Sequence, residues 1–223
     1  MPFAEAGSQR WLQVAINRRP DVLIGALCRA GAVSDSNAIH WSSPLESEGC
    51  CEYRDNVALR KAGIPELRLR SLATFWPQRG PVWDALGQTS DGRGVFVEAK
   101  AHIPEASSLE CKASPASLKL IQKSLAEARR TYAPRATADW SRTFYQYANR
   151  LAHQYLIHEV NRLPSLLVFL YFINAPGMNG PSSECEWRGA IRLLHATLGL
   201  PASLEKCDVF DAFVDVRELQ NAV

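Results

Sequence analysis

The sequence of 223 residues lacks an apolar run long enough to cross a bilayer. Its longest run, Leu166 to Ile173, has only the length of a strand, and the opening residues MPFAEAGSQRW lack the features of a secretory signal. Charge of one sign is not in excess either, because 25 Lys and Arg residues face 23 Asp and Glu residues, for a net charge of +2. We therefore expect a cytoplasmic protein without a membrane partner. Overall charge alone does not indicate nucleic-acid binding.

Several common functional motifs are also missing. The six cysteines show no CxxC spacing, although Cys50 and Cys51 are adjacent, so we expect reduced thiols rather than disulfides or a zinc site. The sequence has no GxxxxGK[ST] or GxGxxG motif, and its five histidines have no HExxH or triad context. Internal repeats are absent as well. These absences argue against P-loop and dinucleotide-binding proteins, zinc proteases and serine hydrolases.

The stretch from Phe75 to His102 is the most informative, because it predicts a β-hairpin. Two runs containing aliphatic and aromatic residues flank Ser90–Gly94, where glycines supply the positive φ angles that tight turns need. If the turn centres near Asp91, Asp84 in the first strand lies opposite Glu98 in the second.

The second strand of this hairpin ends in Glu98-Ala99-Lys100. Side chains alternate along a strand, so Glu98 and Lys100 share one face and Ala99 points away. Two carboxylates close together repel, and Mg²⁺ relieves this repulsion while leaving positions open for water and phosphate oxygens. We interpret Asp84 and Glu98 as metal-binding residues and Lys100 as the residue that holds the attacking water. The alternative is an exposed ion pair on an edge strand, which contributes little.

Asp84 followed by Glu98-Ala99-Lys100, after a hairpin that contains glycine, resembles the PD-(D/E)XK nuclease superfamily. Asp84 matches the first acid of the motif, Glu98 the second acid and Lys100 the lysine, while Trp83 stands where the motif's name has proline. The resemblance implies a restriction-endonuclease-like fold. It also implies Mg²⁺-dependent hydrolysis of nucleic acid, with Mn²⁺ as a possible substitute and DNA as a more expected substrate than RNA.

The resemblance assigns roles to residues outside the hairpin as well. Many superfamily members carry a helical, metal-binding glutamate before the first core strand, and Glu52 in the helix expected over residues 50–62 matches it by order. The alternative for Glu52 is a solvated residue in a first helical turn. Helices after the catalytic strands often place polar side chains in the cleft, which nominates Gln146 and Arg150 in the helix expected over residues 138–161. The alternative for Gln146 and Arg150 is that both lie on a solvent-exposed face of this helix.

Positive charge is concentrated in one part of the chain. Between Lys112 and Arg162, nine Lys and Arg residues face three acids, giving +6, so the remaining residues carry −4. In this segment Lys119 and Lys123 lie largely off the apolar stripe of a helix that begins at Ser114-Pro115. We expect this basic segment to contact the phosphate backbone of a nucleic acid.

The element order predicts an α/β protein with a central mixed β-sheet flanked by helices, in one domain over residues 1–223. A restriction-endonuclease-like αβββαβ core would occupy residues 50–175, after an N-terminal helical addition (1–49) and before a C-terminal helix and strand (176–223). The segment 34–49 reads as a loop in which residues 39–41 form a short strand or fill the core. The expected elements are helices at 8–30 with a break at Pro20 and at 50–62, strands at 67–75, 82–86 and 95–100, helices from 114 and at 138–161, a buried strand at 166–173, a helix from 183 and an edge strand at 207–216.

The leading hypothesis is therefore a Mg²⁺-dependent nuclease. A non-catalytic nucleic-acid-binding or assembly module on the same fold is the main alternative, and an enzyme for another substrate at the same pocket is a third. The sequence leaves strandedness, base specificity and oligomeric state open, with a homodimer among the alternatives.

Overall fold

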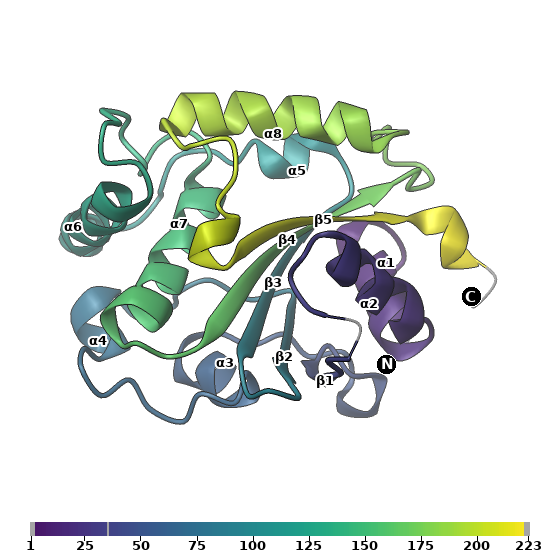
Figure 1. Ribbon diagram of the computed structural model, residues 1–223. Coiled ribbons are helices and arrows are strands. Elements are labelled where there is room, and N and C mark those ends of the chain that lie inside the picture. The colour runs from purple at the N-terminus through teal and green to yellow at the C-terminus, as the bar shows by residue number, and fades with distance from the viewer. Residues whose placement is uncertain (1–2, 35, 221–223) are drawn as a thin grey trace.

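The computed structural model describes residues 3–34 and 36–220, and its centre is one five-stranded sheet (Figure 1). The strands, in their order across the sheet, are β1 (Ile39–Ser43), β2 (Ala85–Thr89), β3 (Gly94–Lys100), β4 (Ser165–Ile173) and β5 (Val209–Asp215). β1, β2 and β3 pair antiparallel, whereas β3, β4 and β5 pair parallel. The sheet is therefore mixed, and the predicted fold class is confirmed.

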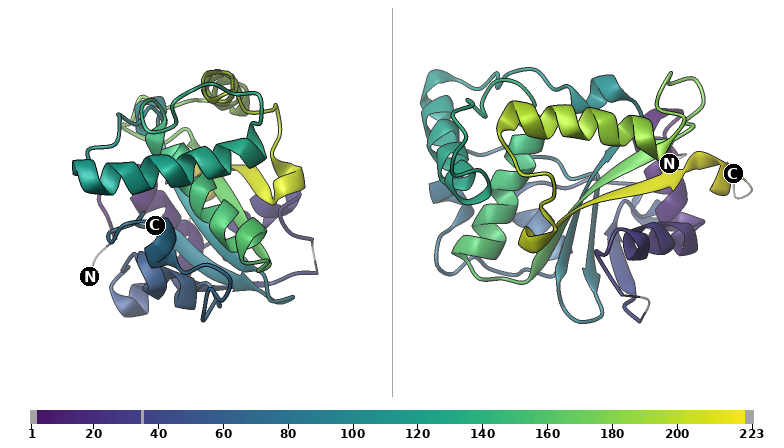
Figure 2. Two further views of the ribbon diagram at one scale, coloured as in Figure 1. Left: turned by 90° about the vertical axis from the view of Figure 1, so that its left-hand side faces the viewer. Right: turned by 45° about the horizontal axis from the view of Figure 1, so that its top comes forward.

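Helices pack on both faces of this sheet (Figures 1 and 2). They are α1 (Gly7–Asn17), α2 (Pro20–Arg29), α3 (Asp55–Lys61), α4 (Leu72–Phe75), α5 (Ile103–Ala106), α6 (Pro115–Tyr132), α7 (Tyr145–Gln154) and α8 (Glu184–Leu198), with the short helical segments η1 (Glu46–Glu48), η2 (Tyr155–Val160), η3 (Glu205–Cys207) and η4 (Val216–Glu218). The buried residues of α1 and α2 pack on one face of the sheet, and those of α6, α7 and α8 belong to the core on the other face. No helix within the described residues is long and apolar enough to cross a membrane.

The side chains and glycine expected at helix ends do their predicted work in two helices, α6 and α8. The side chain of Ser114 accepts a hydrogen bond from the Ser117 N–H at the start of α6, and Ser183 does the same for Glu186 in α8. Gly199 ends α8 with φ near 71°, a conformation in which glycine has no steric cost.

Strand β3 has two different faces, and this difference positions the candidate site. Val95, Val97 and Ala99 point into the apolar core beneath α1 and α2. Glu98 and Lys100 point to the opposite face, where α7 lies. The predicted alternation of this strand is confirmed, so one strand supplies both a core face and a polar cluster.

The strand expected at residues 82–86 is shifted to β2 (Ala85–Thr89), so Asp84 lies just before the strand, and the strand expected at residues 67–75 is wrong. Residues 67–75 form no strand and instead run through bends into α4. The side chain of Asn161 accepts hydrogen bonds from the N–H groups of Leu69 and Arg70, so these donors are satisfied without a sheet neighbour. Arg70 forms an ion pair with Glu127 of α6 rather than lining a sheet face. The strand beside β2 is β1, in the segment expected to be mainly loop.

Two predicted helices begin later than expected. Residues 51–54 are not helical, and Tyr53 forms an isolated bridge with Trp83, so α3 begins at Asp55 and the expectation that Glu52 is helical is wrong. α7 begins at Tyr145 rather than near Ala138. In the preceding segment Trp140 is buried and its indole N–H donates to the carbonyl oxygen of Leu198. Tertiary contacts of Tyr53 and Trp140 therefore replace the expected helical turns.

Candidate active site

A cleft of about 790 Å³ lies over the end of β3 that carries Glu98 and Lys100. One wall comes from the segment that leads into β2, including Val82 and Asp84. The other walls come from α5, from the loop that follows it and from the first turns of α7. The polar face of β3 therefore lines a cleft, although the side chain of Glu98 itself is only 4% exposed.

Asp84 and Glu98 lie side by side, as the hairpin predicts. Ala85 pairs with Val97, and the N–H of Asp84 donates to the carbonyl oxygen of Val97, which places Asp84 opposite Glu98. The Oδ2 atom of Asp84 accepts a hydrogen bond of 2.7 Å from the N–H of Ala99. The backbone of β3 thus fixes the orientation of a side chain that belongs to the neighbouring segment.

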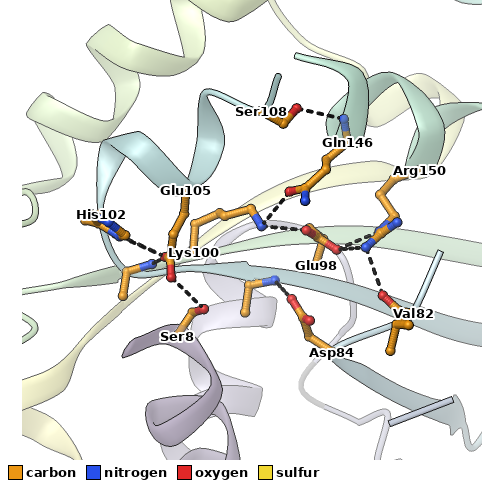
Figure 3. A network of polar contacts seen from close by, with 12 residues as sticks. Ser8, Val82, Asp84, Glu98, Lys100, His102, Glu105, Ser108, Gln146 and Arg150 are labelled. Atoms are coloured by element: carbon orange, nitrogen blue, oxygen red, sulfur yellow. Dashed lines mark hydrogen bonds and ion pairs between the residues drawn. The ribbon is translucent and has the colours of Figure 1, made fainter. Parts of the chain in front are cut away.

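Glu98 is held by two cations (Figure 3). The Nζ atom of Lys100 donates to Glu98 Oε1 over 2.6 Å, and Nε of Arg150 donates to Oε2 over 2.6 Å. Arg150 also donates from Nη2 to the carbonyl oxygen of Val82, and its guanidinium lies over the ring of Trp83. Arg150 therefore ties Glu98 on β3 to the segment that carries Asp84.

The two carboxylates have opposite protonation preferences. Burial raises the pKa of Asp84 to about 8, and the charge of Glu98 adds to this effect. Burial also acts to raise the pKa of Glu98, but the charges of Arg150 and Lys100 outweigh it, so the pKa of Glu98 is lowered. At neutral pH the pair therefore holds one proton, on Asp84, unless another cation enters.

This pair has the chemistry of a site for one hard divalent cation. The charge of such an ion would favour the ionised form of Asp84. No group of three His, Cys, Asp or Glu side chains suited to a metal occurs within residues 3–34 and 36–220. Mg²⁺ commonly binds through one or two carboxylates and completes its shell with water and phosphate oxygens, so two carboxylates open to a cleft fit it.

Glu52 lies near this pair without joining it. Its Oε1 atom accepts a hydrogen bond of 2.9 Å from Gln9 of α1. Burial raises the pKa of Glu52, and the negative charge of Glu98 contributes to the same effect. Glu52 is thus within electrostatic reach of Glu98, although it completes no three-residue metal group among the described residues. Its metal-binding role stays a prediction.

The residues nominated for nucleic-acid contact divide into two pairs. Gln146 and Arg150 both line the cleft, and Gln146 accepts a hydrogen bond of 3.3 Å from Lys100. The side chain of Arg150 is only 7% exposed and is engaged with Glu98. Lys119 and Lys123 are exposed on α6 and do not line the cleft.

Sequence reasoning did not assign the loop after α5, although it forms one wall of the cleft. The Ser108 hydroxyl accepts a hydrogen bond of 2.8 Å from the N–H of Gln146, which fixes this loop to the start of α7. The loop also contributes Leu109 and Lys112 to the cleft. One further cleft residue, Asn149, could have been predicted from the sequence. It lies three residues after Gln146, so helical spacing places the two side chains side by side.

Comparisons with known proteins add no assignment: no family model, no curated protein and no solved structure matches this chain. The function is therefore argued from the geometry of the site.

Proposed function

We propose that this chain is a Mg²⁺-dependent phosphodiesterase that hydrolyses nucleic acid, with DNA as the preferred class, through a site of the PD-(D/E)XK type. One observation carries the proposal. Asp84 and Glu98 lie opposite each other in a cleft, and the ammonium group of Lys100 contacts Glu98. The thiols of Cys50, Cys51, Cys111, Cys185 and Cys207 form no disulfide, which supports the cytoplasm as the location of this activity.

Each residue of the cluster has a role that follows from its contacts. Asp84 and Glu98 would hold the cation, and bound Mg²⁺ supplies charge that neutralises the scissile phosphate and acidifies water. Lys100 orients the attacking water with its ammonium group. Gln146 limits the positions open to Lys100, and Arg150 fixes the carboxylate of Glu98.

The test is cleavage of fluorescent DNA strands in the presence of Mg²⁺ or Mn²⁺. We expect Asp84→Asn and Lys100→Met to lower the cleavage rate by about a thousandfold or more, on the scale of losing a metal ligand or a catalytic group. Asp211→Asn is the matched control, because it changes another inward-facing aspartate of the same sheet outside this cleft. An Asp84→Asn protein that cleaves DNA at the wild-type rate would refute the proposal.

A second candidate function is a non-catalytic nucleic-acid-binding module. The contacts of Lys100 and Arg150 with Glu98 favour it, because they neutralise this carboxylate without a metal. DNA binding that is insensitive to Mg²⁺, together with absent cleavage under every metal condition, would support this candidate over hydrolysis.

A further inference from the structure

The cleft contains a buried polar atom that the proposed hydrolysis does not use. Asn149 lies on α7 between Gln146 and Arg150, lines the cleft and is only 7% exposed. Its Oδ1 atom has no hydrogen-bond partner among the described residues. Buried amide oxygens are almost always paired, and this one has less than 1 Å² of exposed surface, so a ligand N–H donor in the cleft would pair with it once the Asn149 side chain turns towards the cleft.

The surroundings of Asn149 offer apolar contact as well as hydrogen bonds. Tyr145, one helical turn earlier on α7, also lines the cleft. Leu109 on the opposite loop is 74% exposed and faces the same cleft. Pro81 and Pro104 contribute further apolar surface. An aromatic ring and aliphatic surface match the flat faces of a nucleobase, and the unpaired amide oxygen of Asn149 matches a donor at its edge.

The size of the cleft supports a ligand larger than a phosphate group. Its volume of about 790 Å³ lies in the range of pockets that enclose whole organic ligands. The carboxylate pair occupies one part of the cleft, through Asp84 and Glu98. The remainder, between α7 and the loop that carries Leu109, leaves room for a nucleoside next to the reacting phosphate.

The charges around the cleft do not favour a duplex. Lys100 and Arg150 line the cleft but are engaged with Glu98. Lys112, the basic residue that the loop contributes, is accompanied by Glu105 and Glu110. Lys119 and Lys123 do not line the cleft. Binding a duplex relies on several basic residues that neutralise phosphates, whereas one strand can also bind through its bases.

We propose that the substrate at this site is a single strand whose unpaired base enters the cleft and donates an N–H hydrogen bond to Oδ1 of Asn149. Tyr145 and Leu109 provide apolar contact for the base. The inference rests on the proposed function for the identity of the ligand as nucleic acid. Beyond the proposed function, it specifies that the substrate is single-stranded and that Asn149 contacts the base.

The experiment measures binding by fluorescence anisotropy in EDTA, so that cleavage plays no part. Three fluorescein-labelled probes are compared: a 12-nucleotide thymidine strand, the same strand in a duplex and an abasic strand of equal length. We expect the wild-type protein to bind the thymidine strand at least tenfold more tightly than the other two. We expect Asn149→Leu to lose about tenfold in affinity for the thymidine strand and to bind the abasic strand unchanged.

Asn56→Leu is the matched control, because Asn56 is an exposed residue of α3 outside this cleft. It should bind all three probes as the wild type does. Equal wild-type affinity for the thymidine and abasic strands, or tighter binding of the duplex, would overturn the inference, and neither result depends on whether Asn149→Leu folds. Because the readout contains no cleavage, a failed hydrolysis test with Asp84→Asn and a failed inference are distinguishable.

Discussion

Two carboxylates in one row of the sheet have very different surroundings. Glu98 of β3 and Asp211 of β5 both pair with Phe169 of β4, so they point to the same face of the sheet. Tyr147 of α7 stacks on Phe169 between them, with ring centroids 3.9 Å apart. Glu98 opens to the cleft of about 790 Å³, whereas Asp211 lines a separate cavity of about 190 Å³.

The difference lies in the cations that reach each carboxylate. Glu98 contacts both Lys100 and Arg150, and its pKa is lowered despite burial. Burial raises the pKa of Asp211 to about 7, and the opposing effects of Tyr171 and Arg188 are smaller. A buried carboxylate on this face is therefore fully ionised at neutral pH where cations oppose its burial, as at Glu98, and only partly ionised where they do not, as at Asp211. Asp84 resembles Asp211 in this respect, because it has no direct cation contact in the described structure and burial raises its pKa to about 8.

The largest expected effect comes from removing one of the cations that distinguish Glu98 from Asp211. Arg150→Met removes one of the two cations from Glu98 and leaves a buried carboxylate with a single partner. We expect this change to lower the free energy of unfolding by about 3–5 kcal/mol, the cost of breaking a buried ion pair from one side. Urea denaturation at pH 7 measures it.

The matched control for Arg150→Met is Arg188→Met in the surroundings of Asp211. Arg188 forms a half-exposed ion pair with Glu184 one helical turn away, and such pairs contribute about 0.2–1 kcal/mol. Equal destabilisation by the two substitutions would show that the two regions do not differ as described.

A smaller effect concerns the pH dependence of stability. Because the folded-state pKa of Asp211 is raised to about 7, the native state binds its proton more tightly than the unfolded state does. The stability contributed by this proton is complete below about pH 4 and is lost as pH rises through about 7. Asp211→Asn removes this dependence, so the variant should gain about 3 kcal/mol of stability relative to the wild type between pH 5 and pH 8, because about two pH units of the shift fall in this window.

Urea denaturation of both proteins at several pH values gives this difference directly. A difference between wild type and Asp211→Asn that stays constant from pH 5 to pH 8 would mean that Asp211 ionises normally in the folded protein.

The smallest expected effect concerns the positioning of Lys100. Gln146→Leu removes the hydrogen bond of 3.3 Å between Gln146 and Lys100 but leaves the contact of Lys100 with Glu98. We expect kcat for DNA cleavage to fall about tenfold, equivalent to about 1.4 kcal/mol, with little change in KM. Gln122→Leu on α6 is a control outside the cleft. A change in KM with kcat preserved would instead assign Gln146 to substrate binding.

The part of the site that could be predicted is the part built by local chain geometry. Alternation along β3 and a short turn bring Asp84, Glu98 and Lys100 together, and both features can be read from adjacent residues. The resemblance predicts a cleft position for Arg150, and Arg150 lines the cleft, while its contact with nucleic acid stays a prediction. Its engagement with Glu98 depends on how α7 packs across the sheet, and no local sequence pattern indicates that packing.

The features that could not be predicted depend on long-range contacts. Residues 67–75 alternate like a strand, but Asn161, far along the chain, satisfies their backbone instead. Glu52 is not helical because Tyr53 bridges to Trp83. The shared row of Glu98 and Asp211 arises from the parallel register of β4 with its two neighbours, which no local pattern encodes.

The most direct test of the difference between the two regions is calorimetric titration of Mn²⁺ at pH 8. The wild type and Asp211→Asn should bind Mn²⁺ alike, because the pair of Asp84 and Glu98 is intact in both. Asp84→Asn and Glu98→Gln should lose this binding. Undiminished Mn²⁺ binding by Asp84→Asn, or its loss in Asp211→Asn alone, would contradict the assignment of the metal to the cleft of Asp84 and Glu98.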